Sequence, residues 1–204
     1  MKEKEIEDEL VSIRSMMERS SKFISLSGLS GILAGVYALI GAGLAFYIIY
    51  GGSCSSPMFL GLETSSLNSL IAVALAVLIA SLVTGYILTG RKAKRKGQPV
   101  WGKISRALLF YMAVPLVAGG IFILILLYHR HYEVVAASSL IFYGLALVSA
   151  SNFTFTLVKY LGLCEIILGL TAACLPGFGL LFWAIGFGVL HIIYGSLMYL
   201  KYDR

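Results

Sequence analysis

Hydrophobic residues along the chain fall into six long runs that short polar connectors separate. The runs cover about residues 26–50, 67–89, 107–128, 134–151, 155–175 and 178–200. Charged residues are almost absent from these runs and gather between and before them. A bilayer core about 30 Å thick needs roughly 20 apolar residues of helix to cross it. The pattern therefore predicts an all-α, polytopic membrane protein with six transmembrane helices.

Residues 2–22 follow a different pattern, which is typical of an amphipathic helix. Its apolar positions repeat every three or four residues, at Ile6, Leu10, Ile13 and Met17. Acidic residues lie toward the start of this segment and basic residues toward its end, an order that suits the helix dipole. We therefore expect a cytoplasmic amphipathic helix over residues 1–25 and a six-helix transmembrane domain over residues 26–204.

The placement of basic residues favours one orientation of the spans. If the N-terminus lies inside the cell, all Lys and Arg residues fall on the inner side except Arg130. Inner connectors of membrane proteins carry an excess of Lys and Arg. Both termini are therefore expected in the cytoplasm, and the alternation requires an even number of spans.

The membrane topology explains the net positive charge of the chain, because nearly all of the basic residues lie outside the apolar runs. The chain is 59% hydrophobic and 13% charged, with a formal net charge of +6 and a mean hydropathy of +0.90. The sequence holds no P-loop, no GxSxG and no HExxH motif, and its three cysteines lack the spacing of zinc ligands. We therefore expect no enzymatic activity, no cofactor, no metal site and no nucleic-acid partner.

The strongest basic cluster is RKAKRKG at residues 91–97, between the second and third spans. Its cationic side chains are Arg91, Lys92, Lys94, Arg95 and Lys96. Topology and anionic lipid headgroups at the cytoplasmic face account for a basic loop of this kind. A specific soluble partner is the alternative interpretation.

Glu165 is the most informative single residue, because ionisable groups inside a span are rare and usually have a partner. His191 is the natural candidate for that partner. Glu165 lies ten residues after Phe155, about 15 Å deep, and His191 lies nine residues before Leu200, about 13.5 Å deep. Fifth and sixth spans joined by a tight turn would bring the two side chains together. The pair could form a proton-linked or ligand-binding site, or it could simply tie two helices together by a hydrogen bond.

Two further patterns have simpler interpretations. His129, His131 and Glu133 crowd an outer connector, where they could offer metal ligands on one side of an extended strand. A solvated connector is the favoured interpretation, because no further ligand set accompanies them. In the first span, small residues form a ladder of four-residue steps that predicts close helix packing, at Ser27, Gly31, Gly35 and Gly43.

The stretch IRSMMERSSKFISLSGLSGILAGVYALIGA, residues 13–42, resembles the start of a group of uncharacterised six-span integral membrane proteins of bacteria, mainly Bacteroidetes. The resemblance covers the junction between the amphipathic helix and the first span. It implies a bacterial cell inner membrane and transfers no functional residues.

Three functions follow as hypotheses from different classes. The first is a non-enzymatic scaffold or regulatory subunit that engages a cytoplasmic protein or a second copy of the chain. The second is a small transporter or channel subunit with an interior site at Glu165 and His191. The third, an intramembrane enzyme, has the least support. A transport path should gather several polar residues at one depth, and the scarcity of polar residues within the spans favours the first hypothesis.

Overall fold

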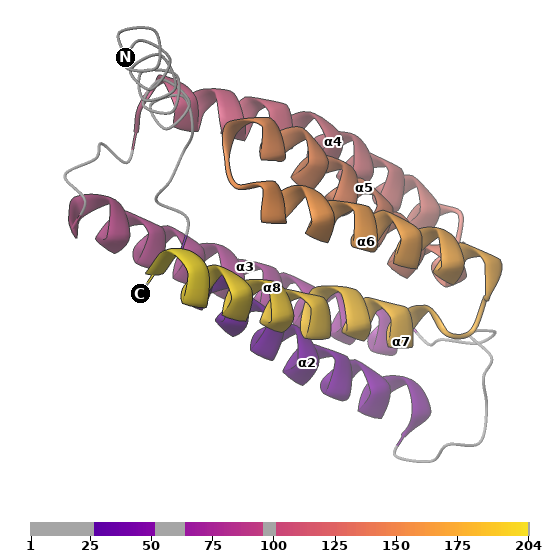
Figure 1. The fold of residues 1–204 in the computed structure, drawn as a ribbon. Coiled ribbons are helices and arrows are strands. Elements are labelled where there is room, and N and C mark those ends of the chain that lie inside the picture. The colour runs from indigo at the N-terminus through magenta and orange to yellow at the C-terminus, as the bar shows by residue number, and fades with distance from the viewer. Residues whose placement is uncertain (1–26, 52–63, 96–100, 204) are drawn as a thin grey trace, which may run out of the picture.

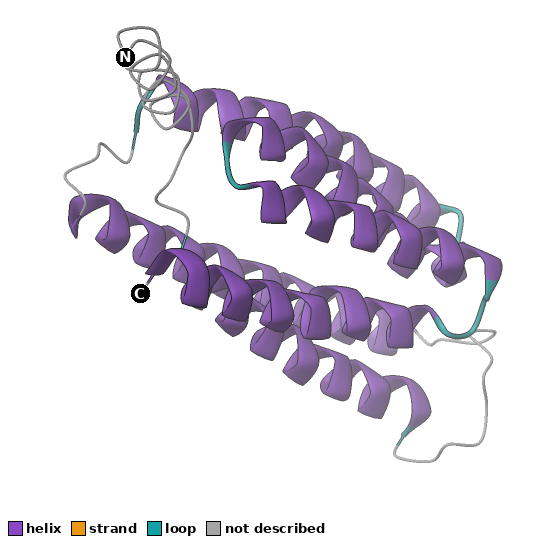
Figure 2. Ribbon diagram, viewed as in Figure 1, coloured by secondary structure: helices purple, strands orange, loops and turns teal. Residues whose placement is uncertain are grey.

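The computed structural model describes residues 27–51, 64–95 and 101–203. The described chain is helical apart from short turns (Figure 2). Six helical segments are long and apolar enough to cross a membrane. The protein is thus an all-α polytopic membrane protein, as the hydrophobic pattern predicts.

The first five spans are single helices: α2 (Gly28–Tyr50), α3 (Thr64–Arg95), α4 (Lys103–Tyr128), α5 (Val135–Ala150) and α6 (Thr156–Cys174). The sixth consists of four consecutive segments, namely α7 (Gly179–Trp183), η3 (Ala184–Leu190), α8 (His191–Met198) and η4 (Tyr199–Asp203). Two short 3-10 turns, η1 (Tyr132–Val134) and η2 (Ser151–Phe153), lie before and after α5.

These bounds agree with the predicted spans to within a few residues, with one larger difference. The predicted second span ends near residue 89, whereas α3 continues to Arg95. The region expected to be a basic loop is therefore largely helix. Lys and Arg are good helix formers, and cations at a helix C-terminus interact favourably with its dipole. The predicted amphipathic helix at residues 2–22 lies outside the described residues.

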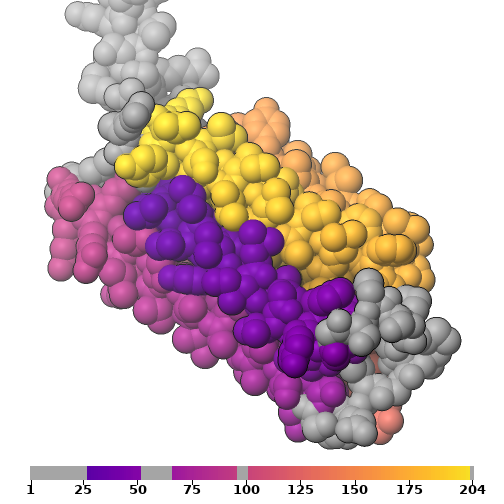
Figure 3. Space-filling view, turned by 90° about the horizontal axis from the view of Figure 1, so that it is seen from below, coloured from indigo at the N-terminus to yellow at the C-terminus, as the bar shows by residue number. Residues whose placement is uncertain are grey.

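The spans form two units of three helices each (Figure 1). In the first, which we call the α2 unit, α2 packs against both α3 and the sixth span. In the second, the α5 unit, α5 packs against both α4 and α6. The sixth span also lies against α5 and α6, and we call this contact between the units the seam. Figure 3 shows α2 in indigo between α3 and the yellow C-terminal helices.

Glycines allow α2 and the sixth span to approach until their backbones touch. A Cβ atom on Gly35 would lie 2.6 Å from the carbonyl oxygen of Gly188, and one on Gly195 would lie 2.7 Å from that of Gly28. Gly28 itself packs against the backbone of Tyr199. The ladder predicted in the first span is used here as far as Gly35. In lipid, such close approach supplies the van der Waals contact that holds helices together.

Glycines also allow a close helix contact within the α5 unit. Cβ atoms on Gly144 of α5 and Gly162 of α6 would lie 2.6 and 2.7 Å from each other's carbonyl oxygens. Two turns further on, a Cβ on Gly169 would lie 2.9 Å from the carbonyl oxygen of Ala137. Each unit therefore has one antiparallel helix pair in backbone contact. The third helix of each unit packs against one member of that pair: α3 against α2, and α4 against α5.

Candidate functional site

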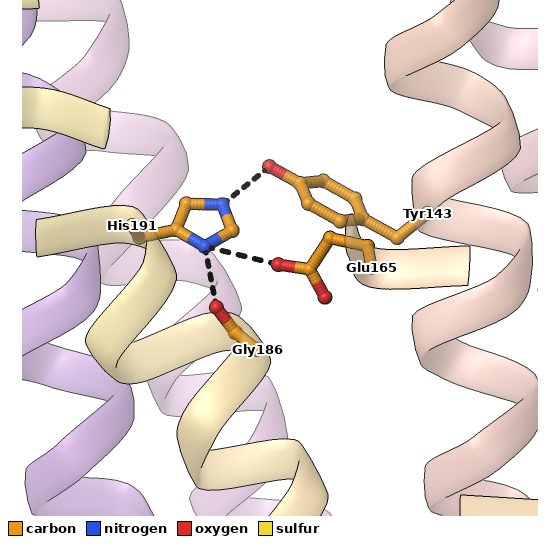
Figure 4. A network of polar contacts seen from close by, with 4 residues as sticks. All are labelled: Tyr143, Glu165, Gly186 and His191. Atoms are coloured by element: carbon orange, nitrogen blue, oxygen red, sulfur yellow. Dashed lines mark hydrogen bonds and ion pairs between the residues drawn. The ribbon is translucent and has the colours of Figure 1, made fainter. Parts of the chain in front are cut away.

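Glu165 lies on α6 at the seam, and its side chain is fully buried, with 0% of its surface exposed. Figure 4 shows it pointing from the α5 unit toward the sixth span, next to the ring of Tyr143 from α5. This position has a local cause. The helix contact at Gly162 and Gly169 sets the rotation of α6, and Glu165 shares its buried face with these two glycines.

His191 approaches from the other side of the seam, and is 6% exposed. It is the first residue of α8, directly after η3, which is a π-helix. A π-helix inside an α-helical span is rare and is frequent at functional sites. The Nδ1 atom of His191 lies 3.0 Å from the carbonyl oxygen of Gly186, within η3. The His191 side chain is therefore hydrogen-bonded to a backbone carbonyl group of the π-helix.

The two hydrogen bonds of His191 define its tautomer. A carbonyl oxygen can only accept, so Nδ1 carries the hydrogen that bonds to Gly186. The hydroxyl of Tyr143 lies 2.8 Å from Nε2 and donates to that nitrogen in the neutral ring. Both ring nitrogens are then satisfied, by Gly186 on its own span and by Tyr143 across the seam (Figure 4).

Glu165 is less well satisfied than His191. Its Oε1 atom lies 3.4 Å from Nδ1 of His191, an ion-pair distance. Neither carboxyl oxygen accepts a hydrogen bond from any residue of the described ranges. A buried polar group without a hydrogen bond is destabilising, and a buried charge more so. Glu165 is therefore the feature of this seam that packing alone does not explain.

Gly186 makes room for the carboxyl group. A Cβ atom on this residue would lie 2.5 Å from Oε2 of Glu165 and 2.5 Å from Cδ2 of Leu140. Any side chain at this position would therefore displace either the carboxyl group or the packing of α5. Gly186 thus accepts the His191 hydrogen bond through its carbonyl oxygen and admits Glu165 through its lack of a side chain.

Aromatic rings enclose the polar groups on the side of η3. The ring of Phe187 lies 5.9 Å from that of His191 in a stacked arrangement and 5.0 Å from that of Tyr143. Trp183 lies 5.1 Å from Phe187 and extends this cluster. Together with the burial of Glu165, these aromatic rings make the seam a buried helix contact.

The sequence pointed to two members of this group and missed two. Glu165 and His191 were expected to meet because their calculated depths match, and the structure brings them together. Tyr143 and Gly186 were not anticipated. A tyrosine in mid-span, whose hydroxyl needs a partner in lipid, was the available signal for Tyr143. Sequence gives no such signal for Gly186, because its role depends on the π-helix.

The predicted lipid or partner contacts lie apart from the seam. Arg91, Lys94 and Arg95 are exposed on the last turns of α3, Lys92 is half-buried there, and Lys96 lies outside the described residues. The starts of α4 and α6 and the C-terminus lie at this same end of the bundle (Figure 1). These segments carry exposed cations, namely Lys103, Arg106, Lys159 and Lys201. We call this end of the described chain, with these residues, the basic end.

The connector between α4 and α5 is a short turn. His131 Nδ1 lies 3.6 Å from Glu133 Oε1, with His131 exposed and Glu133 half-buried, and Arg130 has a positive φ of 60°. Residues 129–133 do not bring three metal-ligating side chains together, and no such group occurs elsewhere in the described ranges.

Comparison with models of protein families, with curated proteins and with solved structures finds no match for this chain. The class of protein is therefore defined by the fold alone: a six-span helical membrane protein made of two three-helix units.

Proposed function

We propose that this protein is a non-enzymatic membrane scaffold or regulatory subunit of a bacterial inner membrane. Both termini lie in the cytoplasm, and the basic end engages anionic headgroups together with a cytoplasmic protein or a second copy of the chain. The observation that carries this proposal is the contrast between an interior with few polar residues and a densely charged end. Seven exposed Lys and Arg residues share the basic end, whereas Arg130 lies in the turn after α4, beyond the end of that helix opposite Lys103 and Arg106.

The geometry of α3 supports a binding role for the basic end. The helix continues to Arg95, so its last cations are held on a rigid element. Lys and Arg near a membrane surface each contribute about 1 kcal/mol of attraction to anionic lipids. Headgroups account for the side chains nearest the membrane, and exposed Lys94 and Arg95 extend the positive surface beyond it.

A photo-crosslinking amino acid at Lys94 tests the proposal in membranes of the expressing cell. The matched control carries the same amino acid at Tyr128, which is 84% exposed at the opposite end of the bundle. We expect a discrete protein adduct, either a homodimer or one cytoplasmic protein, from the Lys94 position only. If that position yields lipid adducts alone and native mass spectrometry finds a monomer, the scaffold proposal is wrong.

A small proton-linked carrier is the second candidate, and one observation favours it. Glu165 carries a carboxyl group that accepts no hydrogen bond within the described ranges and lies between the two units. Carriers commonly bind coupling ions near the membrane midplane, between structural repeats. Under this proposal, Glu165→Gln abolishes pH-dependent flux in proteoliposomes while Glu133→Gln, in the outer connector, leaves it intact. Equal flux from the two variants would exclude the carrier.

A further inference from the structure

We propose that Glu165, His191 and Tyr143 form a proton-binding site in the seam, and that loss of the bound proton loosens the contact between the α2 unit and the α5 unit. This inference goes beyond the scaffold function and does not depend on it. The ligand of the proposed site is a proton. The consequence of losing this proton is a change in how the two units pack.

The first step of the argument is the count of hydrogen-bond donors at the seam. The hydrogen on Nδ1 of His191 bonds to the carbonyl oxygen of Gly186, and the hydroxyl hydrogen of Tyr143 bonds to Nε2. Both of these donors are therefore in use. Glu165 receives only the 3.4 Å contact to Nδ1, which does not have hydrogen-bond geometry.

The second step concerns the charge of the carboxyl group. An ionised carboxylate in apolar surroundings needs donors, and it is strongly destabilised without them. A protonated carboxyl group has no net charge, so it fits a buried contact far better. The packed seam is therefore the proton-loaded form of the site, with a neutral carboxyl group and a neutral imidazole ring.

The third step is the absence of a permanent counter-charge. The elements around Glu165 bring two other titratable side chains toward the seam besides His191, namely Tyr143 from α5 and Tyr194 from α8. The described α2, α5, α7 and η3 contain no Lys, Arg, Asp or Glu, and the only other charged residue of α6 is exposed Lys159 in its first turn. An ionised Glu165 would thus have no cation to pair with unless His191 itself became charged.

The fourth step is what happens when the proton leaves. The nearest donor to the new carboxylate is Nδ1–H of His191, and turning it toward Glu165 breaks its bond to Gly186 and frees a carbonyl oxygen inside the π-helix. Water is a further source of donors, and it can enter only if the units separate. Glu165 and His191 come from opposite units, so either response weakens the seam.

Distances between spin labels test the proposal on the full chain in nanodiscs. The three native cysteines are first replaced by Ser, and labels are attached at Leu82→Cys on α3 and Phe110→Cys on α4. Both positions are well exposed and belong to different units. Over roughly pH 5 to 9, we expect the distance distribution between the units to lengthen or broaden as pH rises. A label pair within the α5 unit, at Phe110 and Tyr160, should not change.

Variants separate the proton site from a general effect of pH. Glu165→Gln cannot lose a proton, so its distance between units should stay constant, whereas Glu133→Gln should respond as the native protein does. A native distance that does not change with pH overturns the proposal, as does an unaltered response in Glu165→Gln.

Infrared difference spectroscopy covers the case in which Glu165→Gln fails to fold. The native protein should lose the carbonyl stretch of one protonated carboxyl group over the same pH range in which its units separate. In Tyr143→Phe, which keeps the carboxyl group but removes the donor to His191, this loss should move to a different pH. If no carboxyl group in the native protein changes protonation over that range, the inference is wrong.

Discussion

Replacing Gly35 by Ala should destabilise the protein, although Ala is a better helix former than Gly. The added Cβ atom would lie 2.6 Å from the carbonyl oxygen of Gly188, 2.7 Å from Cγ1 of Ile192 and 3.0 Å from the backbone nitrogen of Ile192. Two of these three neighbours are backbone atoms, which cannot turn away as a side chain can. The clash must be relieved by moving α2 away from the sixth span.

The size of the stability loss in Gly35→Ala follows from these distances. A comfortable carbon–oxygen contact is about 3.3 Å, so the helices must separate locally by about 0.7 Å. Overpacking of this kind costs about 1–3 kcal/mol, against which Ala offers a gain of about 0.5–1 kcal/mol in helix propensity. We therefore expect a net loss of about 0–2.5 kcal/mol.

Gly43→Ala is the matched control, because Gly43 lies on the same helix and has nothing within 4 Å of its added Cβ. The gain in helix propensity is common to both variants, so the difference between them isolates the clash. Reversible unfolding in mixed micelles with increasing SDS should separate the two variants by about 1–3 kcal/mol, with Gly35→Ala the less stable. If both variants unfold at the same SDS fraction, the backbone contact of α2 with the sixth span is not as described.

Three further outcomes are expected in the same unfolding assay. Gly186→Ala should lose about 1–3 kcal/mol, because its Cβ would collide with Glu165 and Leu140; stability equal to the native protein would contradict the placement of Glu165. Tyr143→Phe removes the 2.8 Å hydrogen bond to His191 and should lose about 0.5–1.5 kcal/mol. Thr171→Val, whose hydroxyl bonds only its own helix on an exposed face, serves as its control and should change stability by less than about 0.5 kcal/mol.

The number and bounds of the spans could be predicted from sequence because a single physical requirement governs them. Lipid demands long uncharged helices, and each helix satisfies its own backbone hydrogen bonds. That requirement does not determine where a helix ends once the chain has left the apolar run. Beyond residue 89 the chain leaves the apolar run, and propensity rather than hydropathy keeps α3 helical to Arg95.

The contact between Glu165 and His191 could be anticipated from depth, because a rise of about 1.5 Å per residue converts sequence position into height in the membrane. Which spans are neighbours is a different question. All six spans are apolar on every side. The periodicity of their apolar residues therefore does not predict that α2 packs on the sixth span or that α5 packs on α6. The π-helix over Ala184–Leu190 is also not predicted by the sequence, because its apolar residues and glycines resemble those of the neighbouring α-helical segments.

The contact between α2 and the sixth span has a consequence for biogenesis. Among the spans α2 is synthesised first. The helix that its glycines contact, which includes Tyr199, is synthesised last. The α5 unit, by contrast, can assemble as soon as its three consecutive helices have been inserted. A chain that ends before residue 179 and has been released from the ribosome would therefore have a complete α5 unit, whereas the glycine face of α2 would be covered only by lipid or by the insertion machinery.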